Sequence, residues 1–464
     1  MLKRRLGLLQ AVSLNMSMMV GVGPFIAIPL LFGKLEGPQA MLGWVVGAAV
    51  AVSDGLVWSE LAAAFPGSGG TYHFFDAIFG RSRMGRALKF LFVWQFLFSG
   101  PLELASGMLG FADYAAYVWP GLMRVVWQSA GVGTLRGKNL LAVGAMAALV
   151  ALAYRRIEAA GRLMIVLWLG MLVSVGWVIA EGLARFDPAL AFDFPEGAWH
   201  LDGAFVYGLG GTLGLAMYSY LGYYQVCYLG DEVVGPARVI PRSIAISVAS
   251  VAAIYLAMTL GILGVIPWRE AMGSPHIASD FIARLRGPAA AKGISLLVMW
   301  SAVAACFAAL LGYSRIPYAA ARSGHFFRGL AATHPTGDFP HRALLLLGAL
   351  AAVACLGDVD SVIGALLTSR ILIQFVGQVG AVFYLRRRPD LMARMPFRMV
   401  LYPVPAVVAL VGWLWVFGTT SRASILYGLA SLAVGAAAFA IWDRGPRADP
   451  GRDGNETGPT VPRA

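Results

Sequence analysis

Charged side chains are scarce in this sequence. Asp, Glu, Lys and Arg make up 13% of the 464 residues, whereas soluble domains carry roughly 25%. A water-soluble surface cannot be assembled from so few charges, and 59% of the residues are hydrophobic. The shortage of charge excludes an ordinary soluble globular protein and indicates a chain embedded in lipid.

Other absences narrow the function. The three cysteines lie inside apolar segments, too few and too scattered for a disulfide framework. The six histidines lack the spacing of metal ligands, so we expect neither a metal nor a cofactor. No P-loop occurs, which argues against ATP as the direct energy source, and no catalytic constellation suggests an enzyme. The net charge of +12 comes from basic residues between apolar runs, so nucleic acid is not an expected partner.

Long apolar runs dominate what remains. A membrane-spanning helix needs roughly 20 apolar residues, and runs such as 41–61 and 244–266 are long enough. They do not alternate as barrel strands do, so we predict an all-α integral membrane protein. About twelve spans are predicted, at 8–33, 38–64, 88–118, 137–154, 161–183, 202–230, 241–268, 292–321, 341–358, 362–386, 397–419 and 421–442.

The basic residues predict the orientation. Lys and Arg are concentrated at 3–5, 81–89, 155–162, 238–242, 315–342 and 386–398, which fall on one side of the membrane if the N-terminus is inside. No cleavable signal peptide is evident, so the first span should be retained. We therefore expect a multi-pass protein of the cell (inner) membrane with both termini in the cytoplasm. The polar segment 443–464 is predicted to be a disordered cytoplasmic tail.

The first span is interrupted by its own sequence. Residues 20–25 read Val-Gly-Val-Gly-Pro-Phe. Pro24 lacks an N–H group and its ring clashes with the carbonyl group of Val20. The preceding glycines lower the cost of leaving helical geometry. The pattern predicts an unwound turn near the middle of the bilayer.

The sixth span suggests a second break. Four glycines fall within 208–214, and the tyrosine-rich stretch 218–224 follows. Broken helices at matching positions in two halves point to a transporter binding site. Free N–H groups at a helix start favour a carboxylate, and freed carbonyl groups favour an ammonium group, so the pair suits a zwitterion. The alternative is that glycine and proline are simply common in membrane helices.

At these residues the sequence resembles the amino acid–polyamine–organocation permease family. The similarity lies in the segments 21–25, 60–72, 222–242 and, more weakly, 314–335. It implies a five-plus-five inverted repeat of the leucine-transporter type with broken helices 1 and 6. The repeats would cover 8–183 and 202–386 within a transport core 8–386, followed by two accessory helices at 397–442.

The resemblance also implies a substrate site. Carried over by position, the substrate-binding residues are Val20, Gly21, Val22, Gly23, Tyr218, Ser219, Tyr220 and Leu221. A Gly-Pro-Phe version of the first motif occurs in relatives linked to polyamines. Proton-coupled relatives often carry a lysine in helix 5, and this chain has none between Asn139 and Gly182.

Ionisable residues within spans are functional candidates because lipid makes them costly. Glu103 in span 3 is a candidate for proton coupling or for binding the amine of a cationic substrate. A structural alternative is an ion pair with Arg370 in span 10, or a neutral hydrogen-bonded acid. Asp54 in span 2 is assigned to structure or gating.

Another charged group lies at the predicted cytoplasmic ends of the helices. A salt-bridge network closing an inner gate is one interpretation, and a solvated charge cluster is the other. The residues are Glu60, Asp231, Glu232 and Arg238.

Taken together, the sequence predicts a secondary transporter, a symporter or exchanger, that moves amino acids by alternating access. Polyamine transport by the same fold is the alternative substrate hypothesis. A sensor that has lost transport, and a channel, are alternatives from other classes, and the paired breaks favour alternating access over an open pore. The expected partners are a small amino acid or polyamine, membrane lipid and a coupling ion, for which the proton is the candidate.

Overall fold

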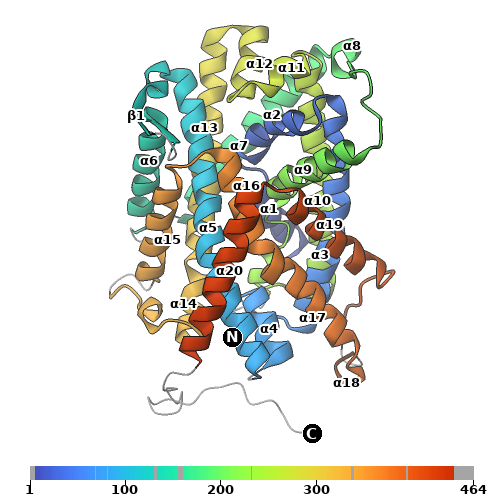
Figure 1. The fold of residues 1–464 in the computed structure, drawn as a ribbon, viewed down its shortest axis with the longest axis vertical. Helices are drawn as coiled ribbons and strands as arrows, with labels where there is room; N and C mark the ends of the chain where they lie inside the picture. Colours follow the sequence, from blue (N-terminus) through green and yellow to red (C-terminus); the bar gives the residue numbers. More distant parts are fainter. Residues whose placement is uncertain are drawn as a thin grey trace.

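The computed structural model describes residues 6–67, 69–80, 82–129, 133–154, 160–230, 232–335, 339–392 and 395–443. The predicted tail lies outside these residues from 444 onward. The described part is almost entirely helical (Figure 1), which confirms the all-α prediction. Its sheet is one hairpin, β1 (Val125–Ser129) with β2 (Gly133–Arg136), which was not predicted.

The first predicted span is broken where the sequence indicated. α1 (Leu8–Met19) ends before three non-helical residues, and α2 (Gly23–Leu35) begins at the Gly-Pro pair. The two helices meet at an angle of 52°. Because proline at the start of a helix loses no hydrogen bond, Pro24 favours a new helix start at this point.

The rest of the first half follows the predicted spans. Its elements are η1 (Pro38–Met41), α3 (Leu42–Ala64), α4 (Thr71–Phe79), α5 (Arg83–Val118), η2 (Pro120–Met123), α6 (Gly137–Ala153) and α7 (Ala160–Ala184).

The second half begins after the short helix α8 (Pro188–Ala191). It contains α9 (Gly203–Tyr220), η4 (Gln225–Tyr228), α10 (Pro236–Leu263), α11 (Trp268–Met272), α12 (Ile277–Arg286), α13 (Pro288–Tyr313), α14 (Arg315–Arg322), η5 (Arg328–Ala331) and α15 (His341–Ala354). The tenth predicted span is α16 (Val359–Arg370), the π-helical segment η6 (Ile371–Val376) and α17 (Gly377–Arg386). After α18 (Pro389–Met392) come α19 (Val404–Thr419) and α20 (Arg422–Trp442).

Length and composition support membrane spans. Among the described residues, 6 stretches are long and apolar enough to cross a bilayer, and the bent pair α1–α2 makes up to 7. Shorter apolar helices occupy 137–153, 169–184, 341–354 and 404–419. Together with α9, these helices account for every predicted span, so the chain is a multi-pass membrane protein.

Contacts between helices follow an internal repeat. α5 packs against α16, and the corresponding helices of the other half, α13 and α7, pack together. In the same way, α3–α9 corresponds to α1–α10, and α5–α15 corresponds to α13–α6. In each of these comparisons, every helix is replaced by the helix at the same position in the other half, and the two replacements are again in contact. This is the pattern of a five-plus-five repeat.

The sixth span breaks later than its glycines suggested. α9 is continuous through 208–214, and the interruption is the turn 221–224 before η4. The glycines serve helix packing instead: a Cβ atom on Gly208 would lie 2.6 Å from the carbonyl oxygen of Lys34. One on Gly210 would lie 2.5 Å from a side-chain atom of Thr419. Glycine therefore allows α2 and α19 to approach α9 closely.

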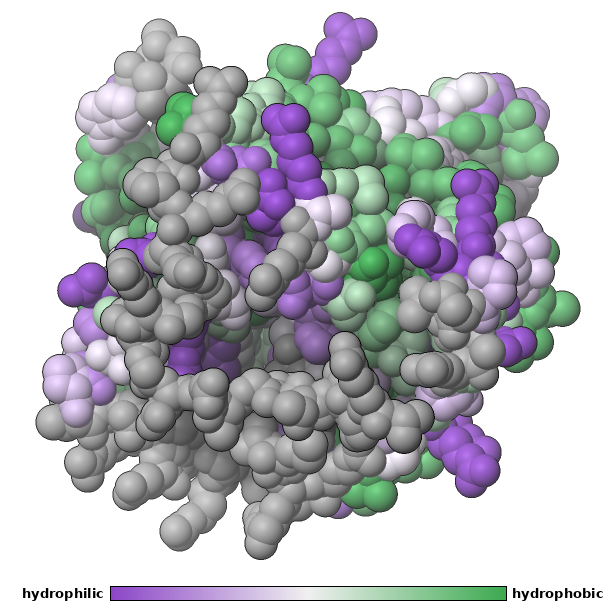
Figure 2. Space-filling view, turned by 90° about the horizontal axis from the view of Figure 1, so that it is seen from below, coloured by the Kyte–Doolittle hydropathy of each residue, from purple (hydrophilic) through white to green (hydrophobic). Residues whose placement is uncertain are grey.

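Both described chain ends lie at one end of the bundle, the lower end in Figure 1. The amide group of Leu6 donates to the carbonyl oxygen of Glu232 (3.0 Å), and that of Val234 donates to the carbonyl oxygen of Leu6 (3.0 Å). Seen from this end, hydrophilic side chains lie around the centre, and toward the rim apolar side chains alternate with further hydrophilic ones (Figure 2). That distribution suits a surface at a membrane boundary.

A buried ion pair also closes the lower end. Arg386 donates from Nε and Nη2 to the two carboxylate oxygens of Glu60, both at 2.6 Å. The amide group of Met399 donates to Glu60 Oε2 (2.7 Å), and the Glu60 side chain is fully buried. The pair joins α3, α17 and the segment before α19.

We predict that Glu60→Gln destabilises the protein by about 3–5 kcal/mol, because it leaves the Arg386 charge buried and without its counter-charge. The matched control is Arg269→Gln, which breaks an exposed pair with Asp193 and should cost about 0–1 kcal/mol. Thermal unfolding in detergent measures both. Equal effects of the two substitutions would contradict a structural role for the buried pair.

Candidate functional site

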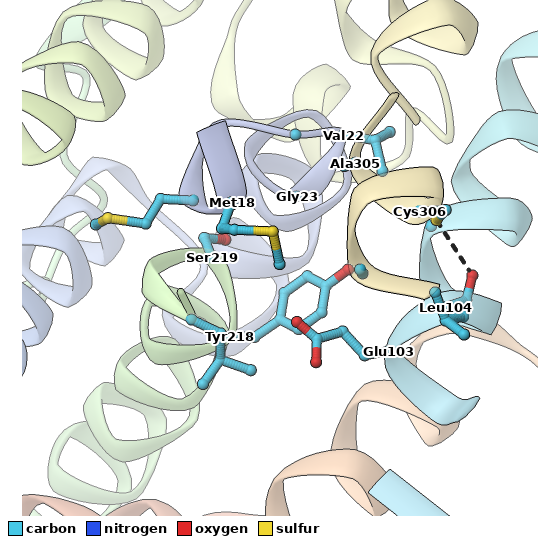
Figure 3. Close-up of a pocket in the computed structure, with 14 residues that line it drawn as sticks. Met18, Val22, Gly23, Glu103, Leu104, Tyr218, Ser219, Ala305 and Cys306 are labelled. Atoms are coloured by element: carbon cyan, nitrogen blue, oxygen red, sulfur yellow. Dashed lines mark hydrogen bonds between the residues drawn. The ribbon is translucent and has the colours of Figure 1, made fainter. Parts of the chain in front are cut away.

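The two helix interruptions meet at a cavity of about 60 Å³ in the interior of the bundle (Figure 3). Since one water molecule needs roughly 10–15 Å³ by this measure, the cavity is small. α1, the α1–α2 break, α5, α9 and α13 form its walls. The lining residues are Met18, Met19, Gly21, Val22, Gly23, Glu103, Leu104, Gly107, Tyr218, Ser219, Leu221, Ala305, Cys306 and Ala309.

The break in the first span presents unused backbone donors. The amide group of Gly21 donates to the carbonyl oxygen of Met19 (3.1 Å). Within the described part of the chain, the amide groups of Val22 and Gly23 donate to no acceptor. Both residues line the cavity at the start of α2. Free N–H groups and the positive end of the helix dipole make this wall suitable for an anion.

Tyr255 on α10 joins the two interruptions. Its hydroxyl group lies 2.6 Å from the carbonyl oxygen of Met19 and 3.0 Å from that of Ser219, so its one hydrogen is shared between these two acceptors. The breaks also touch directly, because Gly222 has a φ of 108°. A Cβ atom there would lie 2.5 Å from Cβ of Met18. Only glycine meets both requirements.

Tyr218 forms the wall opposite the break. Ser106 donates its one hydroxyl hydrogen to the carbonyl oxygen of Glu103 (2.7 Å), so the hydroxyl group of Tyr218 is the donor in its 2.9 Å contact with Ser106. This bond fixes the ring of Tyr218 beside the Glu103 side chain (Figure 3). α5 and α9 are thereby joined at the cavity.

Glu103 lines the cavity, and its negative charge is paired with the positive charge of Arg370. Its Oε2 atom lies 2.6 Å from Nη2 of Arg370 and accepts a hydrogen bond from the hydroxyl group of Tyr313 (2.6 Å). Arg370 is 2% exposed and also donates from Nε to Ser99 (3.1 Å). The structure thus shows the Glu103–Arg370 ion pair, which was one of the alternatives. Arg370 directly precedes the π-helical segment, a feature frequent at functional sites.

Six of the predicted substrate residues line the cavity: Gly21, Val22, Gly23, Tyr218, Ser219 and Leu221. Val20 and Tyr220 do not. Tyr220 is buried against α3, where its hydroxyl group donates to the carbonyl oxygen of Trp44 (3.0 Å). Its place in the substrate site is therefore corrected to one in helix packing, because successive residues of a helix face different directions.

The predicted gating residues do not form one network. Glu60 pairs with Arg386 rather than with Arg238. Arg238 is exposed, and neither it nor Glu232 has an ion pair among the described residues. Asp231 lies outside the described residues. Asp54 is buried in α3, away from the cavity lining, and binds Tyr223.

Several residues of the site had no signal in the sequence. Tyr255, Ser106 and Tyr313 act through bonds to helices far away along the chain. Met18 and Cys306 also line the cavity. Periodicity identifies a buried face of a helix but not the neighbour that the face will meet.

Two interrupted helices that meet at an internal cavity, within a bundle of apolar helices, are typical of a membrane transporter. A sequence model of the family described as amino acid permease matches residues 6–439. The chain therefore belongs to the amino acid permease family, and the resemblance to the amino acid–polyamine–organocation permeases is confirmed. It is a membrane amino acid transporter and not an enzyme.

Relatives over nearly the whole chain are transporters. An uncharacterized transporter of Mycobacterium tuberculosis is 30% identical over 455 residues, covering 95% of this chain and 91% of the relative. The human cystine/glutamate transporter is 27% identical, covering 96% and 87%. The serine/threonine exchanger of Bacillus subtilis is 24% identical, covering 93% and 96%.

We predict that Tyr255→Phe weakens amino acid binding about tenfold. The substitution removes the hydroxyl group that joins the two breaks and leaves the buried carbonyl group of Ser219 without a donor among the described residues, at a cost of about 1–3 kcal/mol. Tyr402→Phe is the control, since Tyr402 lies outside the cavity lining. Titration of the purified protein with a panel of radiolabelled amino acids measures both. Unchanged affinity in Tyr255→Phe would contradict its role in aligning the breaks.

Proposed function

We propose that this protein moves small neutral amino acids across the cell membrane by alternating access, as an exchanger or symporter. The observation that carries the proposal is the meeting of both interrupted helices at one cavity with unused backbone donors. Such a site recognises the groups that all amino acids share. The serine/threonine exchanger among the relatives supports a small substrate.

The substrate carboxylate would bind at the start of α2. The amide groups of Val22 and Gly23 supply hydrogen bonds, and the helix dipole adds favourable electrostatics. The ammonium group would lie toward the end of α9 and Oε1 of Glu103. That oxygen takes part in neither the Arg370 nor the Tyr313 contact, both of which use Oε2.

The lining favours a small and uncharged side chain. Gly107 of α5 and Ala305 and Cys306 of α13 line the cavity, and Glu103 is the single charged residue of the lining. Because Arg370 balances that charge, no excess negative charge remains to attract a polyamine. A polyamine also has no carboxylate for the amide groups of the break. Both arguments favour an amino acid over the polyamine alternative.

Contacts between chain segments on both sides of the cavity support alternating access. At the lower end, Leu6 bridges to Val233. At the other end, a second cavity lies among α2, α9, α16 and α20, where Lys34 and Asp360 form an ion pair (3.4 Å). We propose that these contacts open in turn, the first toward the cytoplasm and the second toward the outside.

The proposed orientation places both termini in the cytoplasm of a cell (inner) membrane, as the distribution of Lys and Arg favours. The proposed repeats are 8–183 and 202–386 within the transport core 8–386, with α19 and α20 as accessory helices. Helix contacts support the repeat, since pairs in one half have counterparts in the other.

Uptake of radiolabelled L-serine into proteoliposomes, with unlabelled L-serine inside or absent, tests the function. We expect saturable uptake that other small neutral amino acids inhibit and putrescine does not. Dependence on internal amino acid would identify an exchanger, and uptake without it a symporter. Uptake of putrescine but of none of the twenty amino acids would contradict the proposal.

Gly23→Ala tests the cavity itself. An added Cβ atom would lie 3.7 Å from Cα of Ser219 and 3.8 Å from Cε1 of Tyr218, an ordinary contact on the cavity wall. We therefore expect normal folding and at least a tenfold loss of L-serine affinity, because the methyl group takes substrate space (about 1–3 kcal/mol). Scintillation proximity binding and melting temperature measure the two effects.

The matched control is Gly33→Ala in the same helix. Its added Cβ atom would lie 3.8 Å from Cγ of Met272, a similar contact outside the cavity. Both affinity and melting temperature should stay at the wild-type level. A Gly23→Ala protein that binds L-serine as tightly as Gly33→Ala would show that the substrate lies elsewhere.

A further inference from the structure

A second buried acid lies apart from the cavity. Asp54 in the middle of α3 is fully buried, and Tyr223, in the turn after α9, hydrogen-bonds to its Oδ2 atom. Its Oδ1 atom has no hydrogen-bond partner among the described residues. A buried carboxyl group with an unsatisfied oxygen is costly, so it requires an explanation.

Two indole groups face the same carboxyl. The N–H groups of Trp58 and Trp413 lie near Asp54, and in the part of the chain that the structure describes neither completes a hydrogen bond. Both tryptophans are fully buried and fixed by stacking: Trp58 on Tyr224 at 4.3 Å between ring centroids, and Trp413 on Phe375 at 3.8 Å. The site thus holds an acid among neutral donors.

In the part of the chain that the structure describes, no cation pairs with this acid. The titratable groups that face Asp54 are Tyr223 and Tyr224 of the turn and Cys227 of η4. α10 brings the apolar Ile244 against the neighbouring Gly55, and α19 brings Trp413. Among the described residues, Asp54 has no ion pair, in contrast to Glu103 with Arg370.

The surroundings of Asp54 have opposite effects on its charge state. Burial without a counter-charge favours the neutral acid. The phenol and two indole donors favour the carboxylate, because a carboxylate accepts hydrogen bonds and an acid must also donate one. A group under both influences can exist in either state, and the proton is the cation that changes one into the other.

The protonation state of Asp54 affects a hydrogen bond in the turn 221–224, which is the break after α9. As a carboxylate it accepts the hydroxyl hydrogen of Tyr223. When a proton from water binds to the carboxylate, the new O–H group can donate to Tyr223, whose own hydrogen must then find another acceptor. Tyr223 lies in the turn 221–224, which includes Gly222 against Met18 of α1. Trp413 links the site to the π-helical segment through Phe375.

We propose that Asp54 is a proton-binding site, separate from the substrate cavity, whose protonation changes the geometry of the turn between α9 and η4. Its role as the coupling site of transport rests on the proposed function. Proton binding itself does not, so the two can be tested separately.

Infrared difference spectroscopy between acidic and alkaline buffer tests proton binding without any substrate. We expect a carbonyl band of a protonated carboxyl group that is lost in Asp54→Asn and shifted in Tyr223→Phe, which keeps the acid but removes a hydrogen-bond partner. Asp193→Asn is the control, because Asp193 is exposed and paired with Arg269, so its loss should leave the band in place. A band that persists unchanged in Asp54→Asn would overturn the proposal.

Proteoliposomes that contain a pH-sensitive dye test the coupling. Addition of external L-serine should acidify the interior of wild-type vesicles, and Asp54→Asn should lose at least nine-tenths of this signal while L-serine counterflow continues. Proton movement that continues in Asp54→Asn would overturn the coupling role. If wild-type protein moves no L-serine, the proposed function fails, and the infrared result still decides proton binding.

Discussion

The structure depends on the N–H and carbonyl groups at the break between α1 and α2. In a continuous helix these groups would hydrogen-bond to one another, but here they lack those partners within the membrane. Lipid offers no hydrogen-bond partners, so such groups persist only where protein or water takes them up. Here α1 stops at Met19 and α2 restarts at Gly23. The hydroxyl group of Tyr255 lies against the last carbonyl group of α1 and that of Ser219. On the other side of the break, Val22 and Gly23, whose amide groups donate to no acceptor among the described residues, line the cavity. One constraint therefore both shapes the bundle and provides the recognition chemistry.

The few charges inside the bundle are arranged around this interruption in two ways. Glu103 is held by Arg370 and Tyr313, which fixes α5, α13 and α16 about the cavity. Asp54 has aromatic donors and no cation, and it touches the turn that ends the second break. A permanent pair suits a residue that keeps the site in shape. An unpaired acid suits a residue whose charge changes during a transport cycle.

Much of the fold could be predicted from the sequence, because long apolar runs admit one solution in lipid, and Pro24 with its glycines locates the first break. The second break was placed too early, since glycines within 208–214 can serve either unwinding or close packing, and only the neighbouring helices decide. The same limit explains Tyr220, whose side chain faces Trp44. Tyr255 and the π-helical segment were missed because their roles depend on contacts between distant parts of the chain.

Binding of L-serine in competition with L-serine methyl ester and ethanolamine tests the central claim most directly, namely that the interrupted helices recognise a zwitterion. The methyl ester keeps the amine and the side chain but loses the carboxylate charge, and ethanolamine lacks the carboxyl group altogether. The account predicts that both compounds compete at least a hundredfold more weakly than L-serine does, a difference of about 2.7 kcal/mol. Competition by either compound at the strength of L-serine would contradict carboxylate binding at the start of α2.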